Sequence, residues 1–234
     1  MVKVLPDGGY LVVGTTQSSN LDPGKRGKTD AWLIKLDELG NLVWSKTYGA
    51  DGNDFAKAAW INPDGTILVL GYSDSGIGLS PDHHGATDGW LMKLQTDGQV
   101  VWTKQYGGLR ADYLSTINTG PNNTYLLAGS TYSQEETIGE HMGARDEWVL
   151  NIDANGTVLW SKTFGGSQQE AITDVLTLSD GWLLGGYSRS VEGPDAAFGY
   201  EDYTFRKIDW SGVEQWRGRY GGSENDRALG WCSI

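Results

Sequence analysis

Apolar and polar positions follow one another along this chain in a pattern that returns four times. In its clearest copy, Asp30 opens an apolar segment, a turn with Gly40 follows, and Trp44 lies in a second apolar segment. The later copies place the equivalents of Trp44 at Trp102, Trp160 and Trp216, so the spacing between copies is 58, 58 and 56 residues. A fixed period of this size indicates stacked supersecondary units.

Within one copy the pattern predicts four strands. The first follows an acidic residue, as at residues 54–61, and a tight turn with glycine separates it from the second, as at residues 67–72. A long polar loop leads to the third strand, and a short Asp-x-x-Gly turn leads to the fourth. The second and third strands are nearly continuous apolar runs, which is typical of sheets buried on both faces. We therefore expect an all-β chain, a β-propeller of four-stranded antiparallel blades with four repeats.

The four repeats predict a single propeller domain over residues 1–234. Residues 1–5 align with the end of a first strand, and residues 226–234 align with its beginning. Residues 226–234 would then either complete the first blade and close the ring, or begin a further blade of a larger ring. A third alternative is that two chains pair to make eight blades, so both a monomer and a homodimer stay open.

The recurring tryptophans are expected to pack between blades, because a feature present in every repeat serves the repeat. This structural set comprises Trp32, Trp90 and Trp148 in the third strands and Trp44, Trp102, Trp160 and Trp216 in the fourth strands.

Composition excludes several classes of protein. The formal net charge is −12, which argues against nucleic acid as a partner, because binding a polyphosphate requires lysine and arginine. Cys232 is the single cysteine, so no disulfide can form within the chain. No window of 18 apolar residues predicts a membrane span, and the first residues do not resemble a signal peptide.

Residues 37–44, 153–160 and 209–216 carry Asp-x-x-Gly-x-x-x-Trp and resemble the tryptophan-docking repeat of quinoprotein-type propellers. The wider unit is similar to propeller repeats of secreted bacterial surface proteins. The matching residues are His84-Gly85, Asp88, Trp90, Lys93-Leu94, Trp102, Lys104, Tyr106-Gly107-Gly108, Asp112 and Asp7-Gly8-Gly9-Tyr10. The resemblance spans the whole chain and implies a propeller in a secreted or cell-surface protein, with a cytoplasmic location as the alternative. It implies no particular activity.

Two sets of acidic residues recur at strand starts, and both are expected at the same end of each blade. One set opens the third strands, and the other set, Asp54, Asp112, Glu170 and Asp226, opens the first strands. One interpretation is a ring that binds a hard cation such as Ca²⁺; no other cofactor is expected. The other interpretation, which we favour, is that each carboxylate holds its own loop by accepting backbone N–H bonds.

Residues that do not recur are better candidates for binding, because the fold does not require them. The long loops between second and third strands differ in sequence, and loops on a rigid scaffold commonly carry function. The candidates in or next to these loops are Lys25, Arg26, His83, His84, Glu140, His141, Arg145 and Asp195.

Catalytic signatures such as a nucleophile elbow or a phosphate loop are absent from the sequence. We therefore expect a non-catalytic binding or display module that takes a protein or glycan on the face with the long loops. The alternative is a hydrolase or metal-dependent enzyme with acidic residues at the mouth of the propeller.

Overall fold

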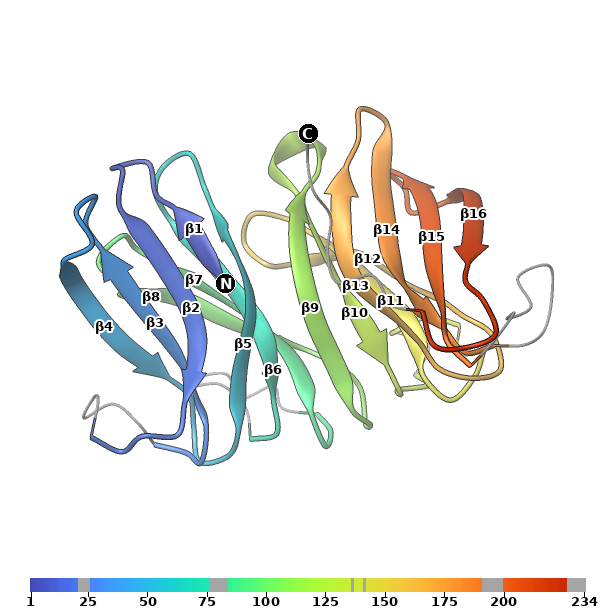
Figure 1. Cartoon of the computed structure of the whole chain (residues 1–234), viewed down its shortest axis with the longest axis horizontal. Helices are drawn as coiled ribbons and strands as arrows, with labels where there is room; N and C mark the ends of the chain where they lie inside the picture. Colours follow the sequence, from blue (N-terminus) through green and yellow to red (C-terminus); the bar gives the residue numbers. More distant parts are fainter. Residues whose placement is uncertain (21–25, 76–83, 136, 141, 191–199, 227–234) are drawn as a thin grey trace. The chain divides into compact units, whose positions relative to one another are not determined.

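The structure is a computed structural model, and it describes residues 1–20, 26–75, 84–135, 137–140, 142–190 and 200–226. In these residues the chain is all-β, with one short 3₁₀ turn, η1 (Pro121–Asn123). Sixteen strands form four sheets, each of four antiparallel strands in sequence order (Figure 1). The four-strand repeat that the sequence predicted is therefore confirmed.

The sheets are numbered along the chain. Sheet 1 contains β1 (Val2–Val4), β2 (Tyr10–Thr16), β3 (Asp30–Leu36) and β4 (Leu42–Tyr48). Sheet 2 contains β5 (Asp54–Ile61), β6 (Ile67–Ser73), β7 (Asp88–Leu94) and β8 (Val100–Tyr106). Sheet 3 contains β9 (Asp112–Thr119), β10 (Tyr125–Thr131), β11 (Asp146–Ile152) and β12 (Val158–Phe164). Sheet 4 contains β13 (Glu170–Thr177), β14 (Gly181–Ser188), β15 (Asp202–Asp209) and β16 (Glu214–Tyr220).

The turn between the third and fourth strand of each sheet explains one recurring glycine. Gly40, Gly98, Gly156 and Gly212 have φ between +74° and +84°, a region that side chains with a Cβ rarely adopt. In sheets 1, 3 and 4 an aspartate three residues earlier fixes the same turn, as where Asp37 Oδ1 accepts the backbone N–H groups of Leu39 and Asn41.

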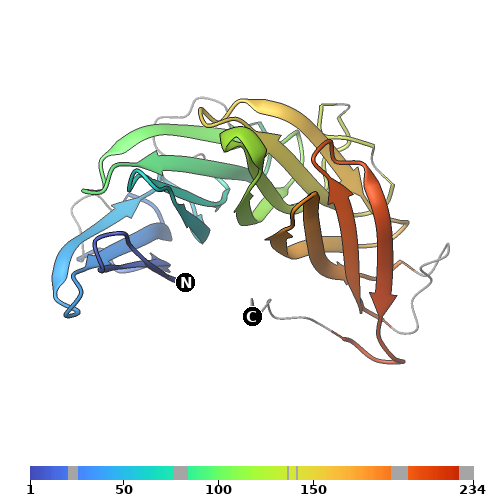
Figure 2. The same ribbon diagram turned by 90° about the horizontal axis from the view of Figure 1, so that it is seen from above.

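The chain divides into two compact units, Met1–Leu114 and Ser115–Ile234. The first contains sheets 1 and 2, and the second contains sheet 4 and all but the first residues of sheet 3. Within each unit the two sheets pack face to face (Figure 2). The prediction of one domain over residues 1–234 stays a prediction, and residues 227–234, on which ring closure was argued, lie outside the described residues.

Each unit buries its own core between its two sheets. In the first unit Leu11, Leu33 and Val69 are fully buried with Trp90, and Trp44 packs against this cluster. In the second unit the core contains Leu126, Val149, Ile172 and Trp182, and Trp160 packs against it. Trp210, in the turn after β15, also packs here, with its ring edge-on to Trp182 at 4.6 Å.

The fourth strand of one sheet docks on a turn of the next sheet through backbone carbonyls. Trp44 Nε1 donates to the carbonyl of Thr96 at 3.1 Å, Lys46 Nζ to that of Asp97 at 2.8 Å, and Tyr48 Oη to that of Gly98 at 2.7 Å. In the second unit Trp160 and Lys162 lie in the same way against the turn glycine Gly212.

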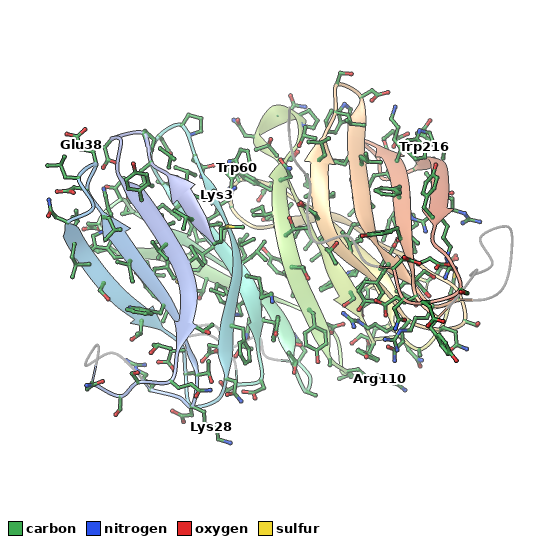
Figure 3. The ribbon with its side chains drawn as sticks, in the orientation of Figure 1. Lys3, Lys28, Glu38, Trp60, Arg110 and Trp216 are labelled. Carbon is green, nitrogen blue, oxygen red and sulfur yellow. The ribbon has the colours of Figure 1, made fainter. Side chains whose placement is uncertain are left out.

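Two of the three third-strand tryptophans lie deeper than the fourth-strand tryptophans. Trp90 and Trp148 are fully buried, and Trp148 Nε1 donates to Ser161 Oγ at 3.0 Å, as Trp32 Nε1 does to Ser45 Oγ. Trp102 is half-buried. Trp216 differs from the packing role expected for it, because half of its surface is exposed on β16 (Figure 3).

No helix among the described residues is long and apolar enough to cross a membrane.

Candidate functional site

The recurring carboxylates, all buried except Asp226, hold the loops at one end of each sheet. Asp54 Oδ2 accepts the N–H of Ala50, Asp112 Oδ2 that of Gly108, and Glu170 Oε2 that of Gly166, each at 2.7–2.9 Å. Asp226 Oδ2 likewise accepts the N–H of Gly222. The carboxylates that open the third strands behave in the same way: Asp30 accepts from Arg26 and Gly27, and Asp88 from His84. These bonds are the ones that the loop-holding interpretation expects.

The two carboxylate sets meet around a recurring glycine. A Cβ built on Gly49 would lie 2.5 Å from Asp54 Oδ2 and 3.1 Å from Asp30 Cγ, and Gly107 and Gly165 are as crowded. The close approach of two carboxylates therefore explains why glycine recurs after the fourth strand. Within the described ranges, no group of three or more His, Cys, Asp or Glu side chains is arranged to hold a metal ion. Binding of Ca²⁺ stays a prediction.

Asp54 has a pKa raised from 3.8 to about 6, because burial disfavours its charged form, although Ser73 Oγ and the Ala50 N–H donate to it. The folded protein therefore holds a proton that the unfolded chain releases between these two pKa values. We expect the contribution of Asp54 to the free energy of unfolding to be greatest below about pH 4. This contribution should fall as pH rises to about 6. Urea unfolding of the wild type and Asp54→Asn across this range measures the effect. An equal pH dependence in both proteins would contradict it.

The structure describes four of the eight predicted loop candidates: Arg26, His84, Glu140 and Arg145. Arg26 and His84 use their backbone N–H groups to bind the carboxylates named above. Arg145 Nε donates to Ser130 Oγ at 2.8 Å, and Nη1 donates to Tyr187 Oη at 3.1 Å, so its side chain joins sheets 3 and 4. Lys25, His83, His141 and Asp195 lie outside the described residues.

Glu140 is exposed and lines an opening of about 420 Å³ with Ser161, Lys162 and Thr163. Its backbone carbonyl accepts a hydrogen bond from Thr163 Oγ1. His84 belongs to the first unit and Glu140 to the second.

A different group of residues lines a second cavity of this unit, which we call the arginine pocket. It has a volume of about 330 Å³ and lies between sheets 3 and 4. Its polar lining comprises Arg206, Arg217 and Arg219, the carboxyl groups of Glu147 and Glu170, and the hydroxyl groups of Ser188, Ser190 and Thr204. Met142, Gly166 and Ser190 also line it, so the pocket lies at the end of the sheets that carries the long loops.

Two of the three arginines are held rigidly by buried partners. Arg206 Nε donates to Glu147 Oε2 at 3.1 Å, and Nη1 donates to Glu214 Oε2. The Arg206 guanidinium also lies over the Phe164 ring, 4.5 Å from its centroid.

The Arg219 side chain is nearly buried, and hydrogen bonds from three of its nitrogens hold it in place. Its Nε donates to Asp202 Oδ2 at 3.0 Å, and its two terminal nitrogens donate to the carbonyls of Ser190 and Ser188 at 2.5 and 2.7 Å.

Arg217 is the most accessible arginine of the pocket. Its side chain is 38% exposed, and its Nε forms an ion pair with Glu214 Oε1 at 3.7 Å. Its guanidinium is therefore the one best placed to meet a ligand.

Burial sets the electrostatics of the Glu147–Arg206 pair. Burial raises the pKa of Glu147, and the adjacent Arg206 guanidinium opposes this shift without reversing it. Burial alone would lower the pKa of Arg206, but Glu147 and Glu214 raise it above its usual value. The pair is thus a buried ion pair whose desolvation is costly.

The arginine pocket exists because sheet 4 departs from the repeat at four facing positions. Thr204 replaces the third-strand tryptophan, and Arg206 replaces an apolar core residue. Arg217 and Arg219 replace small or neutral polar residues of the fourth strand. The residues at these positions in sheets 1, 2 and 3 are Trp32, Trp90 and Trp148; Ile34, Met92 and Leu150; Ser45, Thr103 and Ser161; and Thr47, Gln105 and Thr163.

These residues were absent from the sequence-based candidates, which came from the loops. The missing fourth tryptophan, at Thr204, together with arginines at three positions that are uncharged in the other repeats, was the available signal.

Comparisons with known proteins establish no family for this chain. No family model matches it. It is 23% identical over 173 residues to the regulatory protein FlaEY of Caulobacter vibrioides; the match covers 68% of this chain and 18% of that protein. The chain thus spans about a fifth of this relative's length. A solved structure described as that of the eukaryotic initiation factor aligns with 94% of this chain and 55% of its own, at 11% identity and a TM-score of 0.37.

Proposed function

We propose that this chain is a non-catalytic β-propeller module that binds a small acidic ligand, the carboxylate-bearing sugar of a glycan, in the arginine pocket. The observation that carries the proposal is the concerted replacement of four repeat positions by Thr204, Arg206, Arg217 and Arg219. Each replacement exchanges packing or a neutral contact for polar groups, and a propeller does not require this for its stability.

The pocket suits such a ligand in size and chemistry. Its volume of about 330 Å³ lies at the lower end of the range typical of small-molecule sites. A guanidinium binds a carboxylate through two parallel hydrogen bonds, and Arg217 is accessible enough to do so. Thr204 adds a hydroxyl group that donates its proton to Glu147 and can accept a hydrogen bond from a sugar hydroxyl. Arg206 and Arg219 keep the lining fixed through their own partners.

Glucuronic acid and N-acetylneuraminic acid are the probes for this site, with glucose as the neutral control. We expect both acids, and not glucose, to raise the melting temperature and to give a calorimetric binding signal that weakens with salt. Arg217→Gln should weaken binding at least about tenfold, the loss expected for removing one charged hydrogen-bonding partner. Arg110→Gln, an exposed arginine of the first unit, is the matched control and should bind as the wild type does (Figure 3).

A second variant restores the repeat inside the pocket. Thr204→Trp with Arg217→Ser recreates the pair that Trp148 and Ser161 form in sheet 3. We expect this double variant to fold and to lose the ligand, because the indole fills the cavity. The proposal fails if no acid binds, if Arg110→Gln loses binding equally, or if the folded double variant binds as well as the wild type.

The hydrolase alternative receives less support from the same geometry. It requires a carboxyl group able to exchange a proton with substrate. Glu147 is ion-paired with Arg206, and Glu170 accepts hydrogen bonds from Gly166 N, Ser188 Oγ and Ser190 Oγ. Both carboxyl groups of the pocket therefore serve the fold, and release of free sugar from a glycan by the purified chain would be the result that favours an enzyme.

The ring-shaped propeller and a secreted or surface location are parts of the same proposal. The four meander sheets and their repeated face-to-face packing support the propeller. The resemblance to repeats of secreted bacterial surface proteins supports the location, and an acidic glycan is a ligand that such a protein would meet outside the cell. Accessibility of the protein to protease added to intact cells tests the location.

A further inference from the structure

The fourth strand of sheet 4 carries the residues by which fourth strands dock on a neighbouring sheet, but here those residues are exposed. In the first unit, β4 presents Trp44 and Tyr48 to the backbone carbonyls of the turn between β7 and β8. In the second unit, β12 presents Trp160 to the turn between β15 and β16. Trp216 and Tyr220 occupy the same positions on β16, yet 50% and 64% of their surfaces are exposed.

Neighbouring rings extend this surface. Across the register of β15 and β16, Tyr203 pairs with Tyr220, and Phe205 pairs with Gly218. The Phe205 ring lies 5.7 Å from the Tyr220 ring and 6.5 Å from the Tyr203 ring. The positions of Tyr203 and Phe205 correspond to Ala31 and Leu33 in sheet 1, which are fully buried. We call Tyr203, Phe205, Trp216 and Tyr220 the aromatic face.

Sheet 1 carries the matching surface on its opposite side. Val2, Val12 and Ile34 lie in one row across β1, β2 and β3, and Val4 lies beside them. Val2 and Val4 are 62% and 68% exposed, and Val12 and Ile34 are half-buried. In sheet 2 the equivalents of Val12 and Ile34 are Val69 and Met92, which sheet 1 covers completely. We call Val2, Val4, Val12 and Ile34 the aliphatic face.

The turn between β3 and β4 supplies backbone carbonyls that could accept hydrogen bonds from the aromatic face. The turn between β3 and β4 contains Glu38, Leu39 and Gly40, the equivalents of Thr96, Asp97 and Gly98. Leu39 is 82% exposed, and Glu38 lies at the tip of this turn (Figure 3). Both faces are apolar and exposed, whereas the equivalent residues Leu33 and Val69 are covered by a neighbouring sheet. Both therefore call for a partner.

We propose that the partner is a second copy of this chain, bound head to tail. The aromatic face of each copy covers the aliphatic face of the other, Trp216 Nε1 donates to the Glu38 carbonyl, and Tyr220 Oη donates to the Gly40 carbonyl. In this proposal the contact is made twice, which closes the pair and leaves neither face exposed; a heterologous contact that did not close would give larger assemblies instead. The proposal is independent of the arginine pocket.

Sedimentation velocity and light scattering of the whole chain test it, with circular dichroism to confirm that each variant folds. The wild type should be a dimer of the 25.5 kDa chain. Trp216→Glu disrupts the aromatic face, and Val4→Glu disrupts the aliphatic face. Each should weaken the dimer at least about tenfold, because a charge replaces a buried contact at the centre of an interface. Leu109→Glu, at an apolar residue that is 73% exposed outside both faces, should leave the dimer intact.

Mixing distinguishes head-to-tail pairing from other dimers. Trp216→Glu keeps a sound aliphatic face and Val4→Glu a sound aromatic face, so an equimolar mixture should associate where each variant alone does not. A wild-type monomer overturns the proposal. If Trp216→Glu also destabilises that monomer, the aromatic face is covered within the chain. A dimer that either variant leaves intact, or a mixture that stays monomeric, overturns it as well.

Discussion

Trp148→Ala should lower the free energy of unfolding by about 3–5 kcal/mol, the range for a large aromatic side chain removed from a core. Trp148 has no exposed surface, and its indole N–H donates to Ser161 Oγ. Alanine leaves a cavity on the face of the sheet that the strands cannot close, because the register of β11 with β10 and β12 fixes the backbone. Urea unfolding followed by fluorescence of the remaining tryptophans measures the change.

Two controls accompany this variant. Trp148→Phe should cost less, because phenylalanine fills most of the cavity and loses mainly the hydrogen bond. Leu109→Ala, at a residue that is 73% exposed, should change stability by no more than about 0.5 kcal/mol. A cost below about 1 kcal/mol for Trp148→Ala would mean that this tryptophan is not a core residue.

Arg206→Leu should destabilise the second unit by about 3–5 kcal/mol, although leucine is the residue that sheet 3 has at the equivalent Leu150. The loss arises because Glu147, which is buried, keeps its hydrogen bond from Thr204 Oγ1 but loses its buried cation. Chemical unfolding of the whole chain measures the change.

Adding Glu147→Ala should reverse most of this loss. The double variant carries the apolar and small residues that sheets 3 and 1 have at these positions, Leu150 and Ala31, and leaves Glu214 partly solvated. Replacing a buried ion pair by packed apolar groups is often neutral or stabilising. If Arg206→Leu and the double variant are equally unstable, the cost lies in packing and not in the unpaired charge.

Acid provides a separate check on Arg206→Leu. Without Arg206 the burial of Glu147 raises its pKa against little more than the hydrogen bond from Thr204, so the folded state favours the protonated carboxyl group. The contribution of a group with a raised folded pKa is fully present at low pH and is lost as pH rises. The penalty of Arg206→Leu should therefore shrink as pH falls toward the ordinary pKa of a glutamate.

The four-strand repeat was predictable because its strands and turns recur with a fixed spacing. Gly40 and its equivalents recur because the turn needs a positive φ, and Gly49 and its equivalents recur because two carboxylates close around them. Such backbone requirements act locally, and a single sequence with four copies displays them as an alignment would.

The arginine pocket was not predicted, because it depends on which side chains of sheet 3 face which side chains of sheet 4. Arg206 and Glu147 are 59 positions apart, and neither lies in a long loop. Register places Arg206 opposite Arg217 within sheet 4, and packing places both against sheet 3. Sequence spacing alone indicates the departure from the repeat but not the cavity that it leaves.

Docking through the carbonyls of Thr96, Asp97 and Gly98 has an evolutionary consequence. Every peptide unit supplies a carbonyl, so the receiving turn need not conserve particular side chains in order to accept a neighbour. A duplicated gene segment that encodes one sheet would encode both the fourth strand that docks on a neighbour and the turn that accepts a neighbour. Such chains can lengthen or shorten by whole modules, while the sequences of the intervening loops diverge toward new ligands.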